Sequence, residues 1–322
     1  MNLEPVTDGL LILVAIGLLW KGAGWVVHSA CCVASRFKLP EAVIGATIVA
    51  LGTSAPEIVV TLVAALGGKP DIAVGNVVGS NIFNLGFILG GCATIWAIPT
   101  TRQLVLRDVP VLLLAALLLL LFLSDGTLGR WEGLSMMAIL GGYVLYLVNR
   151  GELEGDEAEE IPIQPARTRD YFMLLLGLVS IISGAHLLVR GASAIAASFG
   201  LSEWAIGVTV VAAGTSLPEL ATAVVAVRRG RSSLMAGTLV GSDLFNVLGV
   251  LGLAAFLQPL TIHPSARASL VMMAAMMAVL LLFMRSGWRI TRIEGACLIL
   301  MACLRWSHDL APGLWSYPGL WS

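Results

Sequence analysis

The sequence predicts an all-α membrane protein of ten transmembrane helices, arranged as two inverted five-helix repeats with broken helices at the repeat core. Of the 322 residues, 58% are hydrophobic and only 12% are charged, which leaves too little polar surface for a soluble protein of this size. Many apolar runs are long enough to cross about 30 Å of hydrocarbon. One long motif also occurs twice in the chain, as expected of an internal repeat.

Hydropathy places ten candidate spans at residues 8–31, 41–66, 72–97, 104–123, 129–148, 171–197, 203–227, 234–257, 267–285 and 292–309. The polar segment Arg150–Asp170 divides them five and five. We therefore expect a first repeat at residues 1–149, an acidic linker at 150–170 and a second repeat at 171–322. The N-terminal residues lack the basic region and cleavage site of a signal peptide, so the first apolar run is expected to be a retained helix.

The duplicated motif ends at Glu57 in its first copy, EAVIGATIVALGTSAPE, and at Glu219 in its second, EWAIGVTVVAAGTSLPE. The same offset of 162 residues relates GNVVGSNIFNLGFILG, from Gly75, to GTLVGSDLFNVLGVLG, from Gly237. Because each repeat has an odd number of spans, the second repeat enters the membrane from the opposite side. Inverted repeats of this kind place a substrate site near the midplane, where the two halves meet.

The charges of the loops predict the orientation independently. Thirteen Lys and Arg residues fall in the loops after the first, third, fifth, seventh and ninth spans, against four on the other side. Because these residues accumulate on the cytoplasmic side, the Arg150–Asp170 loop should be cytoplasmic and both termini should lie outside.

Each copy of the motif places an acid and a proline inside an apolar segment. Glu57 and Glu219 would each cost about 2.5–3.5 kcal/mol in hydrocarbon, so acids of this kind normally face a partner or a wet cavity. Pro56 and Pro218 lack an N–H group and remove a helical hydrogen bond in the same turn. A broken helix is tolerated at this depth only where the freed backbone meets protein, water or a cation. Two such breaks predict one shared cation site.

Oxygen-bearing side chains accompany each acid. Thr53 and Ser54 lie four and three residues before Glu57, and Thr215 and Ser216 repeat this pattern in the second copy. The following spans add two serine–asparagine pairs, Ser80 with Asn84 and Ser242 with Asn246. Carboxylate, hydroxyl, amide and carbonyl oxygens favour hard cations such as calcium. Two close acids can neutralise one divalent ion and would repel each other when empty, which favours exchange of cations over free conduction.

Several other features have simpler interpretations. The motif could be a small-residue packing motif in which the acids pair with Lys21 or Arg190, but prolines and acids repeated at one offset disfavour this reading. His28 and His186 are expected to pack or form hydrogen bonds rather than coordinate ions. The five cysteines are expected to pack in apolar segments, since they show neither a disulfide framework nor zinc spacing. The acidic linker lacks the calcium-loop pattern and is expected to be solvated.

GTSAPE with GSNIFN, and GTSLPE with GSDLFN, resemble the alpha repeats of the calcium/cation antiporter superfamily, specifically its sodium/calcium exchanger branch and bacterial inner-membrane members. The resemblance covers essentially all ten predicted helices. It implies alternating access, with the first and sixth spans sliding across a core that holds the ions. It also implies a ligand set: Glu57 and Glu219 for calcium, backbone carbonyls of Ala50 and Ala212 for sodium, and polar groups of Thr53, Ser54, Thr215, Ser216, Ser80, Asn84, Ser242 and Asn246.

Two positions depart from the pattern of this family. Asn246 stands where potassium-dependent relatives carry an acid, which argues against potassium coupling. An acid appears instead at Asp243, against Asn81 in the first copy. We expect these two residues in a second shell or in a helix interface.

The sequence thus predicts an inner-membrane antiporter that expels calcium in exchange for sodium. Calcium/proton exchange is the alternative within transport, and a cation channel is the alternative from another class. No GxSxG or HExxH sequence indicates an enzyme. The expected partners are the lipid bilayer and the transported ions Ca²⁺ and Na⁺, with no permanently bound cofactor and no nucleic acid. The oligomeric state is not predicted.

Overall fold

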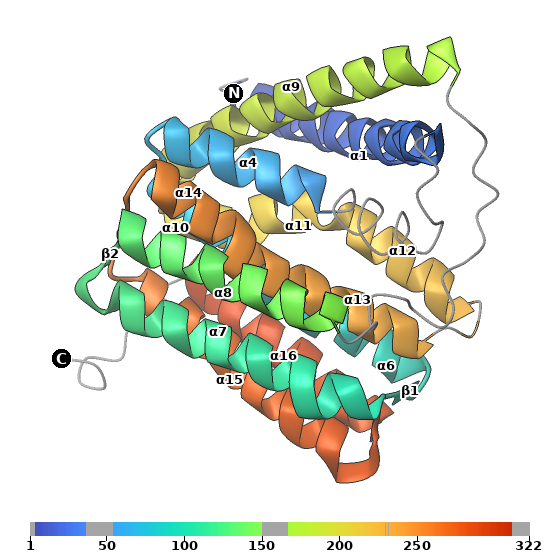
Figure 1. Cartoon of the computed structure of the whole chain (residues 1–322). Coiled ribbons are helices and arrows are strands. Elements are labelled where there is room, and N and C mark those ends of the chain that lie inside the picture. The colour runs from blue at the N-terminus through green and yellow to red at the C-terminus, as the bar shows by residue number, and fades with distance from the viewer. Residues whose placement is uncertain (1–3, 37–53, 150–166, 229, 231, 311–322) are drawn as a thin grey trace, which may run out of the picture.

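The computed structural model describes residues 4–36, 54–149, 167–228, 230 and 232–310, which form helices and four two-residue strands. The α-helices are α1 (Glu4–Arg36), α4 (Ala55–Leu66), α5 (Pro70–Phe83), α6 (Gly90–Ile95), α7 (Val109–Phe122), α8 (Arg130–Asn149), α9 (Thr168–Phe199), α10 (Glu203–Ile206), α11 (Ala212–Thr215), α12 (Leu217–Arg228), α13 (Ser232–Phe245), α14 (Gly252–Leu257), α15 (Ala266–Gly287) and α16 (Arg292–Leu310). Figure 1 shows their arrangement.

Shorter segments join these helices. The π-helical segments are η2 (Asn84–Leu89), η3 (Leu104–Asp108), η5 (Gly207–Val211) and η6 (Asn246–Leu251), and η4 (Leu123–Asp125) is a 3₁₀ turn. The strands are β1 (Ile98–Pro99), β2 (Thr127–Leu128), β3 (Leu260–Thr261) and β4 (Arg289–Ile290). The all-helical class is therefore as predicted.

The secondary-structure elements repeat at the same offset of 162 residues as the sequence motifs. It relates α5 to α13, η2 to η6, α6 to α14 and α8 to α16, each at its first residue. The strands pair across the halves, β1 antiparallel to β4 and β2 antiparallel to β3, and the same offset converts one pair into the other. Within the described residues, the two halves therefore contribute equivalent elements to the structure.

Six helical segments are long and apolar enough to cross a membrane, and a seventh joins α10–α11 to α12 across a bend of 48°. This count covers only the described part of the chain. Length and composition there support a multi-pass membrane protein but do not by themselves give all ten predicted spans.

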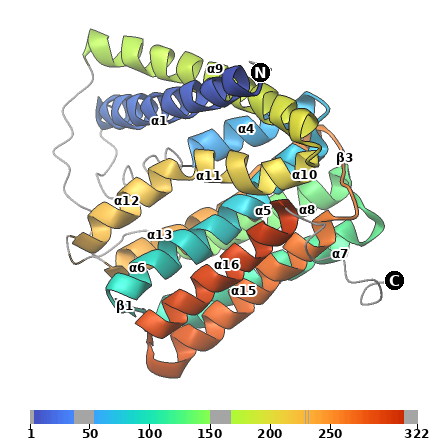
Figure 2. The same cartoon turned by 180° about the vertical axis from the view of Figure 1, so that it is seen from behind.

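The two most deeply buried spans are the continuous helical segments that contain α5 and α13. Within Pro70–Ile95, 89% of the apolar window is buried, and within Met235–Leu257 the value is 72%, whereas the other four spans lie between 28% and 44%. A helix that is buried all round lies in the core of the protein rather than against lipid. These two segments form the centre of the molecule (Figure 2).

Helices α1 and α9 lie side by side in a layer over α4, α11 and α12 (Figures 1 and 2). Their contact depends on small residues. A Cβ added to Gly22 would lie 3.0 Å from the carbonyl oxygen of Gly177, and one added to Gly184 would lie 3.0 Å from that of Ala15. Glycine is needed there because the two backbones approach so closely.

Candidate functional site

The two predicted acids begin equivalent helices in the core. Glu57 lies in the first turn of α4, and Glu219 lies in the first turn of α12. Both side chains are buried, with 0% and 3% of their surface exposed. A helix N-terminus carries a partial positive charge, which favours a carboxylate there. The broken helix expected at Pro218 is present, since α11 ends at Thr215 and α12 begins after a turn at Ser216.

Serines at the helix starts join the two halves reciprocally. Ser216 Oγ donates a hydrogen bond of 3.0 Å to Glu57 Oε1, and Ser54 Oγ donates one of 3.3 Å to Glu219 Oε1. Ser54 Oγ also lies 2.9 Å from Ser242 Oγ. The two carboxylates are close enough to interact electrostatically. We call these five residues, Ser54, Glu57, Ser216, Glu219 and Ser242, the acid cluster.

Asn76 of α5 supports the first acid and was not recognised from the sequence. Its Nδ2 donates to Thr61 Oγ1 at 3.0 Å and to the Glu57 carbonyl at 3.4 Å, while its Oδ1 accepts from Thr215 Oγ1 at 3.1 Å. One amide thus ties α5 to α4 of the first half and to α11 of the second half. The sequence signal was one more amide within the predicted span 72–97, outside the serine–asparagine pair that the duplication marked.

Asp243 lies in the same buried core, 0% exposed, although its role could not be assigned from the sequence. Its Oδ1 accepts from Asn84 Nδ2 at 2.8 Å, and its backbone carbonyl accepts from Asn81 Nδ2 at 3.2 Å. It also interacts electrostatically with Glu219. The structure therefore brings a third carboxylate close to the acid cluster, through the helix that carries Ser242.

Several buried oxygens around the acid cluster accept no hydrogen bond from the residues that the structure describes. They are Glu57 Oε2, Asn81 Oδ1, Asn84 Oδ1, Asp243 Oδ2 and Asn246 Oδ1. Buried polar atoms normally have a partner, so an unpaired group of this kind needs an explanation. Carboxylate and amide oxygens are ligands that hard cations such as calcium and sodium accept.

The asparagines occupy a distinctive place in the backbone. Asn84 is the first residue of η2, and Asn246 is the first residue of η6, its equivalent in the second half. Both side chains are fully buried. A π-helical turn inside an α-helix frequently marks a functional position because it breaks the regular hydrogen-bond ladder.

The other predicted ligands lie nearby or fall outside the described residues. The Ala212 carbonyl accepts hydrogen bonds of 3.1 Å from both Thr215 Oγ1 and the Ser216 N–H, and Ser80 Oγ donates to the Val77 carbonyl at 3.0 Å. Thr53 and Ala50, together with the first-copy helix break before Ser54, lie outside the described residues. Lys21 and Arg190 are exposed on α1 and α9, whereas the acids Glu57 and Glu219 are buried.

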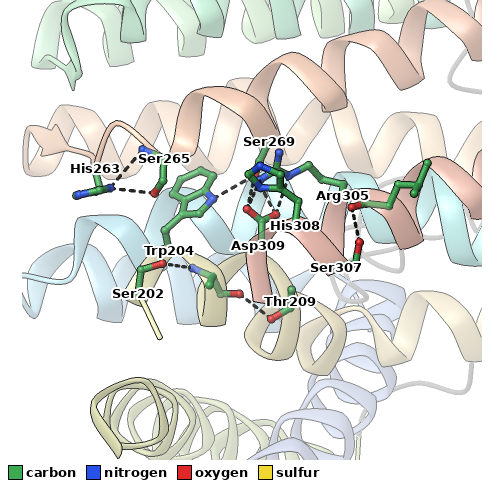
Figure 3. Close-up of polar contacts among 12 residues, drawn as sticks. Ser202, Trp204, Thr209, His263, Ser265, Ser269, Arg305, Ser307, His308 and Asp309 are labelled. Atoms are coloured by element: carbon green, nitrogen blue, oxygen red, sulfur yellow. Dashed lines mark hydrogen bonds and ion pairs between the residues drawn. The ribbon is translucent and has the colours of Figure 1, made fainter. Parts of the chain in front are cut away.

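A second buried polar network anchors the beginning of the broken segment in the second half (Figure 3). Trp204 Nε1 donates to Ser269 Oγ at 3.1 Å, and Ser269 Oγ donates to both carboxylate oxygens of Asp309, at 3.2 and 3.1 Å. Arg305 pairs with the same carboxylate through Nε at 2.8 Å and through Nη2. The network therefore fixes α10 to α15 and α16.

Comparisons with known proteins identify the family of this chain. The family model described as "Sodium/calcium exchanger protein" matches residues 8–149 and 170–304. The chain is 39% identical to the "Putative antiporter CaxA" of Alkalimonas amylolytica over 94% of this chain and 98% of that protein. It is 30% identical to the "Sodium/calcium exchanger MaX1" of Methanosarcina acetivorans, over 90% of this chain and 95% of that protein.

The fold is also similar to a solved structure, that of the sodium-calcium exchanger NCX_Mj soaked with 2.5 mM Na⁺ and 10 mM Sr²⁺. The TM-score is 0.63 at 29% identity, covering 93% of this chain and 98% of that one. The matches extend over both halves and include the duplicated motifs of the acid cluster. The chain belongs to the sodium/calcium exchanger family, within the calcium/cation antiporter superfamily.

Proposed function

We propose that this protein is a secondary active antiporter that extrudes Ca²⁺ in exchange for Na⁺. The observation that carries the proposal is the acid cluster, in which each half contributes one buried glutamate and one serine that donates to the other half's glutamate. A cation held there would contact both halves at once. Relative movement of the halves can then expose the ion to one side of the membrane or to the other.

The donor set supports a hard divalent ion. Glu57 and Glu219 together supply two negative charges, which balance the charge of one Ca²⁺. Without a cation, two close carboxylates at low dielectric repel each other, and at least one favours a proton. Release of calcium therefore requires replacement by other cations, which is the energetic basis of exchange rather than conduction.

We assign the ion ligands to the two motifs and to their partner helices. The proposed ligands are Glu57, Glu219, Thr53, Thr215, Ser54, Ser216, Ser80, Ser242, Asn84 and Asn246, with the carbonyls of Ala50 and Ala212 for sodium. Asp243 and Asn81 would support them from a second shell. Family membership and the unpaired buried oxygens support this assignment.

We further propose the inverted arrangement of ten spans in the inner membrane, with both termini outside and the 150–170 linker in the cytoplasm. The reciprocal strand pairs and the constant offset of 162 residues support two equivalent halves. The asymmetry of loop charge supports this orientation.

Radioactive calcium uptake into inverted membrane vesicles tests the proposed function. Vesicles loaded with sodium should accumulate calcium when diluted into sodium-free buffer, and uptake should stop when the sodium gradient is collapsed. Uptake driven by a pH gradient without sodium would instead establish calcium/proton exchange. Flux that needs no counter-ion gradient and follows the membrane potential alone would indicate a channel.

A further inference from the structure

Three side chains with different metal-binding atoms meet where α1 passes the start of α9, away from the acid cluster. His28 and Cys32 lie four residues apart on α1, and Asp170 lies in the first turn of α9. An imidazole nitrogen, the Cys32 sulfur and a carboxylate oxygen all lie within 4.8 Å of one another. We propose that His28, Cys32 and Asp170 bind one transition-metal ion of the zinc class, with water as the fourth ligand.

The distance between the first two ligands fits one tetrahedral ion. His28 Nε2 and Cys32 Sγ are 3.8 Å apart. Bond lengths of about 2.3 Å to sulfur and about 2.0–2.1 Å to nitrogen place these atoms roughly 3.6 Å apart in a tetrahedral zinc site. Small side-chain rotations would therefore complete the geometry without movement of α1.

The third ligand is already oriented by its own helix. Asp170 Oδ2 accepts a hydrogen bond of 2.7 Å from the backbone N–H of Arg167, which caps the start of α9. Contacts of this kind hold a metal ligand in position and raise the affinity of the site. Asp170 is half-buried and Cys32 is buried, whereas His28 is exposed, so an ion can enter from the histidine side.

The chemistry of this cluster differs from that of the acid cluster. Thiolate and imidazole ligands favour zinc and similar ions, whereas carboxylate, hydroxyl and amide oxygens favour calcium and sodium. The two sites should therefore discriminate between the two classes of ion. A bound ion would also link α1 to α9, which already pack closely through Gly22 and Gly177.

The sequence alone did not predict this site. His28 and Cys32 share one helical face, but two ligands four residues apart are common and rarely bind metal by themselves. The third ligand lies at the start of α9, far along the chain from the pair, so only the packing of α1 against α9 brings Asp170 to it. The expectation that His28 only packs or forms hydrogen bonds is thereby replaced by a specific ligand role in our proposal.

Cobalt titration of the purified full-length protein in detergent, with calcium in excess, tests the proposal. Cobalt bound here should show a sulfur-to-cobalt charge-transfer band and the visible bands of a tetrahedral ion, saturating at about one ion per chain. Zinc should displace it. Cys32→Ser should abolish the charge-transfer band, and His28→Ala and Asp170→Asn should each weaken cobalt binding roughly tenfold or more.

Matched controls separate this site from other cysteines and histidines. Cys92→Ser, Cys31→Ser and His186→Ala should each retain the charge-transfer band and the affinity. His28→Ala changes an exposed side chain, so it remains informative even where substitution of the buried Cys32 impairs folding. The proposal is overturned by a wild-type protein without the band, by a band that survives Cys32→Ser, or by one that is lost in Cys31→Ser.

Discussion

The two halves of the molecule share a backbone and a reciprocal contact but surround their acids differently. Ser216 donates to Glu57 and Ser54 donates to Glu219, so each half completes the acid of the other. Asn76 supports the first acid through an amide, whereas the equivalent position in the second half holds a hydroxyl residue, Thr238. The hydrogen bond from a serine to the glutamate of the other half is therefore common to both halves, whereas the other residues around each acid differ.

The halves also differ in charge. Asp243 of the second half is a buried acid, whereas Asn81 at the equivalent position in the first half is neutral. The core thus has two equivalent acids and one additional acid on one side only. An ion held between the halves would experience an asymmetric field, even though the backbone around it is duplicated.

The largest expected effect follows from the shared acids. Glu57→Gln and Glu219→Gln should each reduce sodium-driven calcium uptake by roughly a hundredfold or more. Each substitution removes one of the two negative charges proposed to contact the calcium ion. Equal losses in both variants would support a single shared site. The measurement is radioactive calcium uptake into sodium-loaded inverted vesicles, normalised to the amount of protein.

Another pair of equivalent acids provides the control for this prediction. Glu132 Oε2 accepts from the Gly129 N–H at 2.6 Å, and Glu294 Oε2 accepts from the Thr291 N–H at 2.7 Å, both at the starts of helices. Glu132→Gln and Glu294→Gln should therefore retain most of the uptake. Wild-type uptake in either Glu57→Gln or Glu219→Gln would contradict a shared site.

A second comparison concerns the polar networks that hold the outer helices. Arg305 in the second half is buried against Asp309, whereas the equivalent Tyr143 in the first half donates one hydrogen bond of 2.5 Å to Asp108. Asp309→Ala should lower the free energy of unfolding by about 3–5 kcal/mol, because it leaves the Arg305 charge buried without its carboxylate. Tyr143→Phe should cost about 1.5–3 kcal/mol, since it removes one hydrogen bond to a charged group.

Denaturant unfolding in detergent, followed by tryptophan fluorescence, measures both variants against the wild type. Because Trp204 donates to Ser269 within the Arg305 network, its emission also reports local loosening of α10. Equal destabilisation in Asp309→Ala and Tyr143→Phe would show that the two networks are energetically equivalent, contrary to this interpretation.

A smaller effect is expected from the amide that only one half possesses. Asn76→Ala leaves Thr61 Oγ1 and Thr215 Oγ1 without their amide partner and should cost about 1–3 kcal/mol of stability. Thr238→Ala, at the equivalent position, removes one hydroxyl rather than an amide with three hydrogen bonds, so it should cost less stability than Asn76→Ala. Thermal unfolding of the two variants compares them directly, and an equal loss of stability would remove the proposed asymmetry.

The features that the sequence predicted correctly are those that occur in both halves of the chain. The constant offset predicted two equivalent halves, and the paired prolines predicted the break found at Ser216, because both features are local or periodic. Asn76 carried no second copy to mark it, and Asp243 was noted only as a departure between the copies, expected in a second shell or in a helix interface. Their partners come from other helices, such as Thr215 for Asn76, so their roles depend on packing that no local pattern encodes.

Two further groups were not predicted from the sequence for the same reason. They are the Arg305 network, formed by Trp204, Ser269, Arg305 and Asp309, and the cluster of His28, Cys32 and Asp170. Each residue alone has an ordinary interpretation, as a snorkelling charge or a packed polar group. Only the contacts between distant segments distinguish them, for example the pairing of Trp204 with Ser269. Duplication therefore predicted the residues of the acid cluster, while the structure was needed to find the asymmetric contacts around it.

The most discriminating prediction concerns the additional acid. Asp243→Asn should weaken the apparent calcium affinity about tenfold, or about 1.4 kcal/mol, because it removes a charge that interacts with Glu219 but leaves an oxygen to accept from Asn84. Transfer of the acid to the equivalent position, in Asp243→Asn combined with Asn81→Asp, should recover part of the affinity, since the second charge would then act from the first half. Calcium dependence of sodium-driven uptake measures all three proteins. An unchanged affinity in Asp243→Asn would show that the carboxylate serves only the contact between the two helices, and that the field at the ion comes from the duplicated acids alone.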